Sequence, residues 1–152
     1  MKKYTLKNLM DEHASLQNTA PMTQKKLQKI VVNSDDTEIL EEEAGYVLFK
    51  YLGTKMALYP DEKFNRMRVI SPITTYSTLA PKIKDSLMSA NFHSALDCRY
   101  GVAEDTLYAL FLHPLDSLTQ EDFLSALKQL HNLAQSFGKT YSSAQLEFTK
   151  KK

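Results

Sequence analysis

Runs of aromatic and branched residues in the first half of the chain predict three consecutive strands. Residues 46–52 are aromatic or branched at every position except Lys50, and the tight turn at Gly53 leads into a second strand at residues 55–59. A third strand is expected at residues 65–70, and we expect Pro72 to end it. Because parallel neighbours need a long crossover, three strands joined by short turns form an antiparallel meander.

The second half of the chain combines helical patterns with two more strands. A helix is expected at residues 79–90, with Pro81 in its first turn, where the missing N–H costs nothing. Its buried stripe is Ile83, Leu87 and Ala90. Two strands, at residues 94–100 and 106–112, follow this helix.

A final helix is predicted at residues 119–137, where apolar residues recur every three or four positions. We expect it to pack on the sheet through Phe123, Leu127, Leu130 and Phe137. Thr119 and Asp122 have the spacing of a capping box, and Gly138 stands where a helix C-terminus favours glycine.

The N-terminal region predicts an extension followed by a short helix. Residues 1–20 form an amphipathic helix or a loosely attached arm, whose apolar face contains Leu6, Leu9, Met10, His13 and Leu16. A second helix is expected at residues 22–31. We therefore expect one α+β domain over residues 21–138, ordered helix, three strands, helix, two strands, helix. It is followed by a flexible tail at residues 139–152. Its sheet has five antiparallel strands packed with helices.

Both faces of the predicted sheet are apolar. In the last strand Leu107 and Ala109 point to one side, while Tyr108 and Leu110 point to the other. A sheet with one wet face would alternate apolar and polar residues instead. Either the helices divide between the two faces, or a second subunit or a client polypeptide covers part of one face.

Charge and composition narrow the class of protein. The 152 residues include 19 basic and 18 acidic ones, so the chain lacks the basic excess typical of a nucleic-acid-binding protein. No apolar stretch is long enough to span a bilayer, and residues 4–8 are too polar for a signal peptide. Cys98 is the single cysteine, which favours a reducing compartment. These features predict a cytoplasmic protein with no nucleic-acid or membrane partner.

The candidate chemical groups do not form a catalytic pattern. His93, Asp97 and Cys98 lie close in sequence, but an extended strand would not bring their side chains together, so we expect Cys98 to be buried and unreactive. The histidine and cysteine spacings match no zinc motif, and four glycines provide no phosphate-binding loop. We therefore expect no catalytic residues, no metal and no cofactor.

Two charged clusters favour solvated surface over ligand sites. The acidic run at residues 41–43 is interpreted as a solvated segment before the first strand. Basic residues near the N-terminal helix and the third strand could form a phosphate-binding patch, although the balanced net charge favours a solvated face. They are Lys25, Lys26, Lys29, Lys63, Arg66 and Arg68.

The order of elements and one corner motif resemble a known family. Residues 109–119 run from an apolar strand through Pro114-Leu115-Asp116-Ser117-Leu118-Thr119 into the final helix, and Leu52-Gly53-Thr54 fits a short hairpin. Together these features resemble the class I type III secretion chaperones and the related bacterial YbjN-like proteins. The resemblance implies an α+β sandwich, a homodimer and binding of partly unfolded clients. The near-neutral charge and the extra residues 1–20 depart from the secretion chaperones and favour the YbjN-like side.

The function predicted from these patterns is non-enzymatic binding of a protein or peptide client by a homodimer. The alternative is a small-molecule or nucleotide-sensing regulatory domain. The expected interface residues are Leu87 and Met88 on the middle helix and Leu96 and Tyr100 on the strand after it.

Overall fold

The computed structural model describes residues 5–7 and 20–144. Most of the helix or arm expected over residues 1–20 lies outside this range, as does the end of the expected tail, residues 145–152. The description below therefore concerns the α+β part of the chain.

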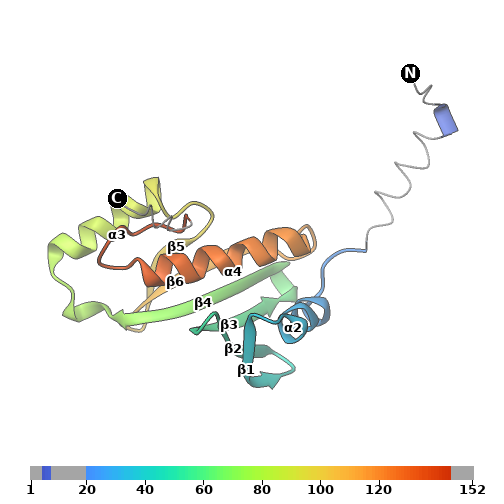
Figure 1. Cartoon of the computed structure of the whole chain (residues 1–152), viewed down its shortest axis with the longest axis horizontal. Coiled ribbons are helices and arrows are strands. Elements are labelled where there is room, and N and C mark those ends of the chain that lie inside the picture. The colour runs from blue at the N-terminus through green and yellow to red at the C-terminus, as the bar shows by residue number, and fades with distance from the viewer. Residues whose placement is uncertain (1–4, 8–19, 145–152) are drawn as a thin grey trace, which may run out of the picture.

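The described chain is ordered as one helix, four strands, a helix, two strands and a helix (Figure 1). The elements are α2 (Gln24–Asn33), β1 (Thr37–Glu43), β2 (Tyr46–Tyr51), β3 (Thr54–Asp61), β4 (Arg66–Thr75), α3 (Pro81–His93), β5 (Arg99–Ala103), β6 (Thr106–Pro114) and α4 (Gln120–Gln135). Short 3₁₀ turns, η1 (Glu62–Phe64) and η2 (Tyr76–Thr78), flank β4. The expected α+β class is confirmed.

The sheet contains six antiparallel strands in the order β1-β2-β3-β4-β6-β5, so the expected count of five is corrected by one. The additional strand is β1, which includes the acidic run interpreted as a solvated segment. Its glutamates stay in water because β1 is an edge strand, where only one side of the ladder is paired. Ile39 of β1 still packs against the core.

Pro72 does not end the third predicted strand, because β4 continues to Thr75. The pairing of β4 with β3 covers only the residues up to Ile70, so at Pro72 no ladder bond to β3 is lost. On the β6 side a register shift falls between Pro72 and Thr74. A proline is tolerated in a strand under these two conditions, at a bulge and beside an unpaired edge.

The strand predicted at residues 94–100 begins later, at Arg99. The residues before it form a turn in which the N–H of Cys98 donates to the carbonyl oxygen of Ala95 at 3.0 Å. Leu96, at φ 55°, occupies the left-handed region within this turn. Leu96 is therefore a turn residue and not, as expected, a strand residue.

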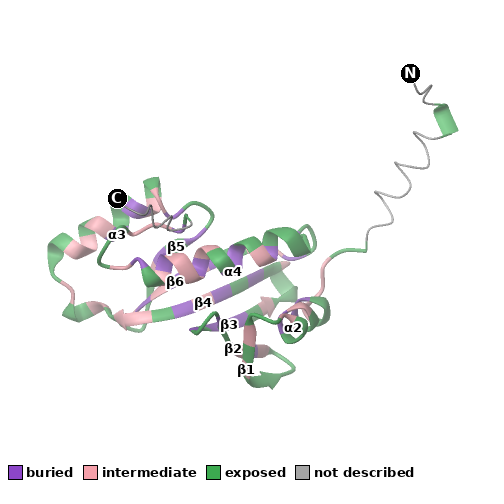
Figure 2. Ribbon diagram, viewed as in Figure 1, coloured by how far each residue is buried: buried purple, intermediate pink, exposed green. Residues whose placement is uncertain are grey.

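Helices α2, α3 and α4 all pack on the same face of the sheet. Figure 2 shows buried and more exposed residues alternating along β4, and the buried ones join the core with residues of each helix. The helical contributions are Leu27 and Val31 from α2, Leu87 and Ala90 from α3, and Phe123, Ala126, Leu127, Leu130 and Leu133 from α4. Of the four residues expected to pack α4 on the sheet, three are fully buried, and Phe137 follows the helix and packs partly buried against the core.

Helix α4 begins as the sequence predicts. The hydroxyl oxygen of Thr119 accepts a hydrogen bond from the N–H of Asp122 at 3.0 Å, which satisfies one free donor of the first turn. After the helix, residues 139–144 of the expected tail are held in place: the N–H of Ser143 donates to the carbonyl oxygen of Ser94 at 3.1 Å. Gly138, at φ 78°, makes the left-handed step between the two segments.

In the turn between β5 and β6, two residues other than glycine adopt positive φ angles. Glu104 and Asp105 have φ angles of 45° and 63°, a region that costs free energy for most side chains. The Asp105 carboxylate accepts hydrogen bonds from both the N–H and the hydroxyl of Ser77, at 2.9 and 2.6 Å. These contacts to η2 stabilise the turn.

Substitution of Phe123 tests whether the packing of α4 dominates stability. Phe123 is fully buried, so Phe123→Ala should lower the free energy of unfolding by about 3–5 kcal/mol in urea titrations. The matched control is Phe64→Ala in η1, where the ring is 66% exposed and the change should stay within about 0.5 kcal/mol. Equal effects of the two substitutions would contradict this account of the core.

Candidate functional site

The four residues predicted to form an interface divide into two pairs. Leu87 and Tyr100 are buried within the subunit, and the Tyr100 hydroxyl donates to the carbonyl oxygen of Leu133 on α4 at 2.9 Å. Met88 and Leu96 are exposed, Met88 by 72%. Within a single subunit, therefore, only Met88 and Leu96 offer their side chains to a partner.

The structure brings three of the four predicted residues together. Leu87, Met88 and Tyr100 line a pocket of about 160 Å³ between α3 and β5, whereas Leu96 lines a separate pocket. Phe92 lies one helical turn after Met88 and is 85% exposed, so α3 presents two neighbouring apolar side chains to solvent. In the sequence, the spacing of four residues between Met88 and Phe92 was the only indication that both side chains lie on the same side of the helix.

The free edge of β5 is closed by a side chain from α3. The amide of Asn91 donates to the carbonyl oxygen of Tyr100 at 3.0 Å and accepts from its N–H at 2.7 Å. Asn91 thus occupies the position that a further strand would take. The opposite edge, β1, contains a register shift and a run of glutamates, and both features oppose strand pairing.

The face of the sheet opposite the helices has an apolar centre, and we call it the open face. It consists of the residues that alternate with the buried ones along β2, β3, β4, β6 and β5. Four of them are cross-strand partners in one continuous row, namely Leu48, Ala57, Ile70 and Leu110. None of the four belongs to the core cluster covered by the described helices. The row is therefore an apolar strip on a face that no described helix covers, where Leu48, Ile70 and Leu110 are half-buried and Ala57 is buried between its neighbours.

Polar and aromatic residues frame this row. On one side the rings of Tyr46 and Tyr59 stack across strands, with their centroids 5.8 Å apart. Hydrogen bonding to Glu41 raises the pKa of the Tyr46 hydroxyl to about 12, so the ring stays neutral at physiological pH. On the other side Tyr108 follows in the register. Tyrosines can contact an apolar partner with the ring and water with the hydroxyl.

Gly101 lets the apolar row reach the edge of the sheet. A Cβ atom at this position would lie 2.6 Å from the Cδ2 atom of Leu110, so the leucine side chain extends over the β5 backbone. A larger residue at Gly101 would displace Leu110. The absence of a side chain at this position therefore shapes the open face.

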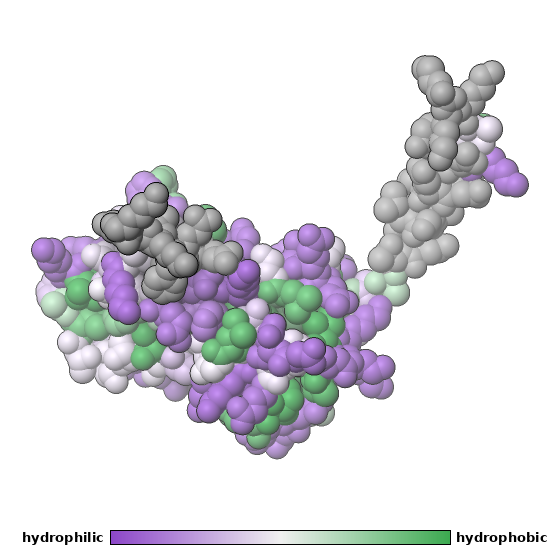
Figure 3. All heavy atoms as spheres, in the orientation of Figure 1, coloured by the Kyte–Doolittle hydropathy of each residue, from purple (hydrophilic) through white to green (hydrophobic). Residues whose placement is uncertain are grey.

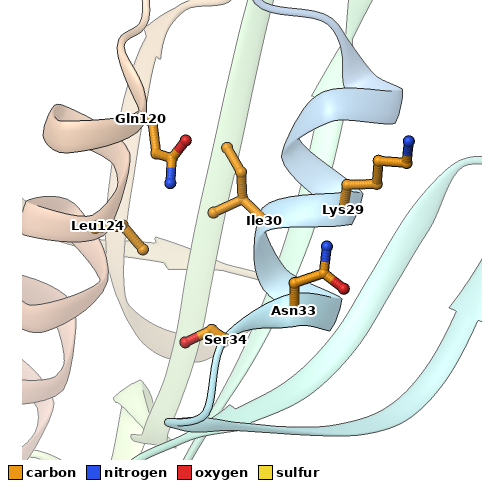
Figure 4. Close-up of a pocket in the computed structure, with 6 residues that line it drawn as sticks. All are labelled: Lys29, Ile30, Asn33, Ser34, Gln120 and Leu124. Carbon is orange, nitrogen blue, oxygen red and sulfur yellow. The ribbon is translucent and has the colours of Figure 1, made fainter.

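A separate depression of about 290 Å³ lies between α2 and α4 (Figure 4). Ile30 points from α2 toward α4, where Leu124 completes the apolar part of the wall, and Lys29 points away from it. The remaining lining residues are polar. In Figure 3 apolar surface appears as separate patches near α2, near the β1–β2 end and near α3.

The groups tested for catalysis are engaged elsewhere. The Asp97 carboxylate accepts a hydrogen bond from the Gln129 side chain at 2.9 Å, and the His93 ring contacts Phe92 edge-on. Cys98 is fully buried, and desolvation, together with the charge of Asp97, raises the pKa of its thiol to about 12. Among the described residues, no three His, Cys, Asp or Glu side chains are grouped to hold a metal.

The expected basic patch is divided between two sides of the molecule. Helix α2, with Lys25 and Lys29, packs on the covered face, whereas Arg66 and Arg68 alternate with buried residues of β4 and belong to the open face. None of the helices in the described part of the chain has the length and hydropathy of a membrane span.

Comparison with known proteins identifies similar folds and no family. No protein-family model matches the chain, and no curated protein gives a significant match. Among solved structures, a chain in the crystal structure of the ExsC-ExsE complex is similar, with a TM-score of 0.50 and 15% identity over 75% of this chain and 92% of that one. A chain in the structure of the HopA1-SchA chaperone-effector complex has a TM-score of 0.48 and 10% identity, covering 76% and 99% of the two chains.

The similarity to the chain from the ExsC-ExsE complex shows a shared α+β fold. The TM-score of the second structure is too low to support an argument. The layout that the sequence resemblance implied is thus supported at the level of the fold, while the YbjN-like part of the resemblance stays a prediction.

The reactivity of Cys98 follows from its raised pKa. At pH 8 a thiol with a pKa of about 12 is ionised in roughly 1 molecule in 10,000, compared with roughly a quarter for an ordinary thiol. A thiol reagent should therefore modify the native protein about 1,000-fold more slowly than the protein unfolded in guanidinium. Rapid stoichiometric labelling of the native protein would contradict the buried, inert assignment.

His131 predicts a loss of stability in mild acid. Burial lowers the pKa of its imidazole, and Nδ1 lies 2.6 Å from the hydroxyl oxygen of Thr54, which also accepts from Gln135. Because the folded-state pKa lies below the unfolded value of about 6.5, the unfolded chain binds more protons. The free energy of unfolding should therefore fall as the pH drops below about 6.5, and His131→Gln should flatten this dependence in urea titrations. An unchanged pH profile in the variant would contradict the assignment of this dependence to His131.

Proposed function

We propose that the protein is a non-enzymatic, chaperone-like protein that binds a polypeptide client on the open face of its sheet. The observation that carries the proposal is the row formed by Leu48, Ala57, Ile70 and Leu110, which no described helix covers. The similarity of the fold to a chain from a complex of two proteins is consistent with this role. The sequence resemblance to secretion chaperones favours it as well.

Burial of apolar surface on the open face can supply enough free energy for binding. Covering about 400 Å² of apolar surface stabilises a complex by on the order of 10 kcal/mol before the costs of association. Lost translational and rotational freedom offsets much of this gain, so micromolar affinity is the expected range for such a surface. A chaperone must also release its client, and moderate affinity is compatible with release.

A homodimer formed through α3 is the second part of the proposal. Met88 and Phe92 are exposed on α3, and Val102, 49% exposed, lies across the small pocket on β5. A stable interface buries more than about 1,000 Å², so these three residues would form its apolar centre. Leu87 and Tyr100 would support that centre from beneath, while Leu96 stays a predicted interface residue at a separate position.

The client-binding proposal predicts the behaviour of a conservative double variant. Ile70→Thr combined with Leu110→Thr keeps strand-compatible residues and removes apolar area from the central row. The ligands are polypeptides that co-purify from a cell lysate with the immobilised wild-type protein. We expect their affinity, remeasured with purified components, to fall by at least about tenfold in the double variant. The control is Val32→Thr, which changes an exposed apolar residue of α2.

Thermal unfolding of all three proteins would confirm that the double variant is folded. If a folded double variant binds the same polypeptides with wild-type affinity, the open face is not the client site.

The dimer proposal predicts that a charge on α3 separates the subunits. Met88→Glu should shift the molar mass measured by light scattering at micromolar concentration from two chains toward one, because the carboxylate would be buried at the interface. Val32→Glu on α2 serves as the control. A wild-type monomer at high micromolar concentration would rule out the dimer, and a dimeric Met88→Glu variant would place the interface elsewhere.

A further inference from the structure

The central row of the open face ends in opposite charges at the two edges of the sheet. The register extends the row beyond its apolar part: Glu41 of β1 is the partner of Leu48, and Arg99 of β5 is the partner of Leu110. Both charged residues are exposed. From edge to edge the row therefore runs Glu41, Leu48, Ala57, Ile70, Leu110 and Arg99.

This order makes the row complementary to itself. A two-fold axis that runs along the strands, between β3 and β4, turns the sheet over and reverses the strand order β1-β2-β3-β4-β6-β5. In a second copy placed by this axis, β1 faces β5, β2 faces β6 and β3 faces β4. The small side chain of Ala57 then meets Ile70, and the two leucines meet each other. At each edge Glu41 of one copy meets Arg99 of the other.

The rows between the central one and the β3–β4 turn fit the same arrangement. Tyr59 is the cross-strand partner of Arg68, so the axis sets the ring of one copy against the guanidinium group of the other, and such pairs attract. Two residues further along, Asp61 is the partner of Arg66, so the two residues can also form ion pairs between the copies.

The row on the other side of the central one places lysines opposite uncharged residues. Lys50 and Lys55 are cross-strand partners on β2 and β3, and Tyr108 and Pro72 are partners on β6 and β4. All four lie two residues along their strands from the central row. The axis therefore brings Lys50 to Tyr108 and Lys55 to Pro72, and no like charges stand directly opposite each other.

The other two-fold arrangement is disfavoured by charge. An axis across the strands would place each strand over itself, so that Glu41 would face Glu41 and Arg99 would face Arg99. Like charges that face each other across an interface oppose association. The order of the central row therefore selects the axis along the strands, which gives the aligned packing of sheets in β-sandwiches.

From this arrangement we infer that the open face pairs with the open face of a second copy of the chain. The overlay measures roughly 25 by 20 Å, so it covers about 1,000 Å² on the two copies together, the lower end for a stable interface. We therefore expect weak association, with a dissociation constant on the order of 100 µM. Because α3 packs on the covered face, this interface is separate from the dimer proposed above. A client of the open face would have to displace the second copy.

Sedimentation equilibrium measures this association on the full chain carrying Met88→Glu, which removes the proposed contact through α3. Between about 10 µM and about 1 mM, we expect the mean molar mass to rise from one chain toward two. Raising the salt concentration from about 50 to about 300 mM should weaken the association severalfold, because the edge pairs are exposed to solvent. A protein that stays monomeric at about 1 mM would overturn the inference.

A charge swap in the same background tests the pairing of the two edges. Glu41 and Arg99 lie at opposite edges of the sheet, about 24 Å apart within one copy, so they interact appreciably only between copies. Glu41→Lys and Arg99→Glu should each raise the dissociation constant at least about fivefold, because each opposes like charges twice per dimer. The two substitutions together should bring the dissociation constant back to within about twofold of its starting value.

Glu42→Lys is the matched control. Glu42 is exposed on the same strand, but it is the partner of buried Val47 and so lies on the other side of β1 from Glu41. The substitution makes the same change in net charge and should alter the dissociation constant by less than about twofold.

Two results of the charge swap would overturn the inference. One is single variants that associate as the Glu42→Lys control does, and the other is a folded double swap that fails to restore association. Thermal unfolding establishes that each variant is folded. No client is present in these measurements, so either result leaves the client proposal to its own test.

Discussion

The packing of α4 on one face of the sheet is the constraint on which the rest of the molecule depends. Phe123, Leu127 and Leu130 are fully buried against strands that contribute their own buried residues to the same cluster. Helices α2 and α3 join that cluster from the same side (Figure 1). With the described helices on one face, the opposite face keeps apolar residues that no described helix covers. The proposed binding surface is thus a direct consequence of how the core is built.

The periodicity of the sequence was sufficient for the fold class and for most of the elements. Strand β2 and helix α4 have strong patterns, and Thr119 caps α4 as its spacing predicts. Strand β1 was missed because an edge strand need not be apolar, and its glutamates look like a loop. The extent of β4 depended on where β3 stops pairing, and no local signal at Pro72 contains that information.

The candidate site was only partly visible before the structure. The apolar character of both sheet faces correctly raised the question of what covers them, and the sequence left both answers open. Which residues share a row depends on the register between β2, β3, β4 and β6, which places Ile70 between Ala57 and Leu110.

The bidentate contact between Asn91 and Tyr100 links two properties that are usually separate. The side-chain amide fastens α3 to the sheet and simultaneously shields the backbone of the edge strand. A partner that displaced α3 would therefore uncover an edge able to accept another strand, and it would also withdraw Leu87 and Ala90 from the core. The same coupling sets a limit on mutation: loss of one amide would expose an aggregation-prone edge while leaving the hydrophobic core unchanged.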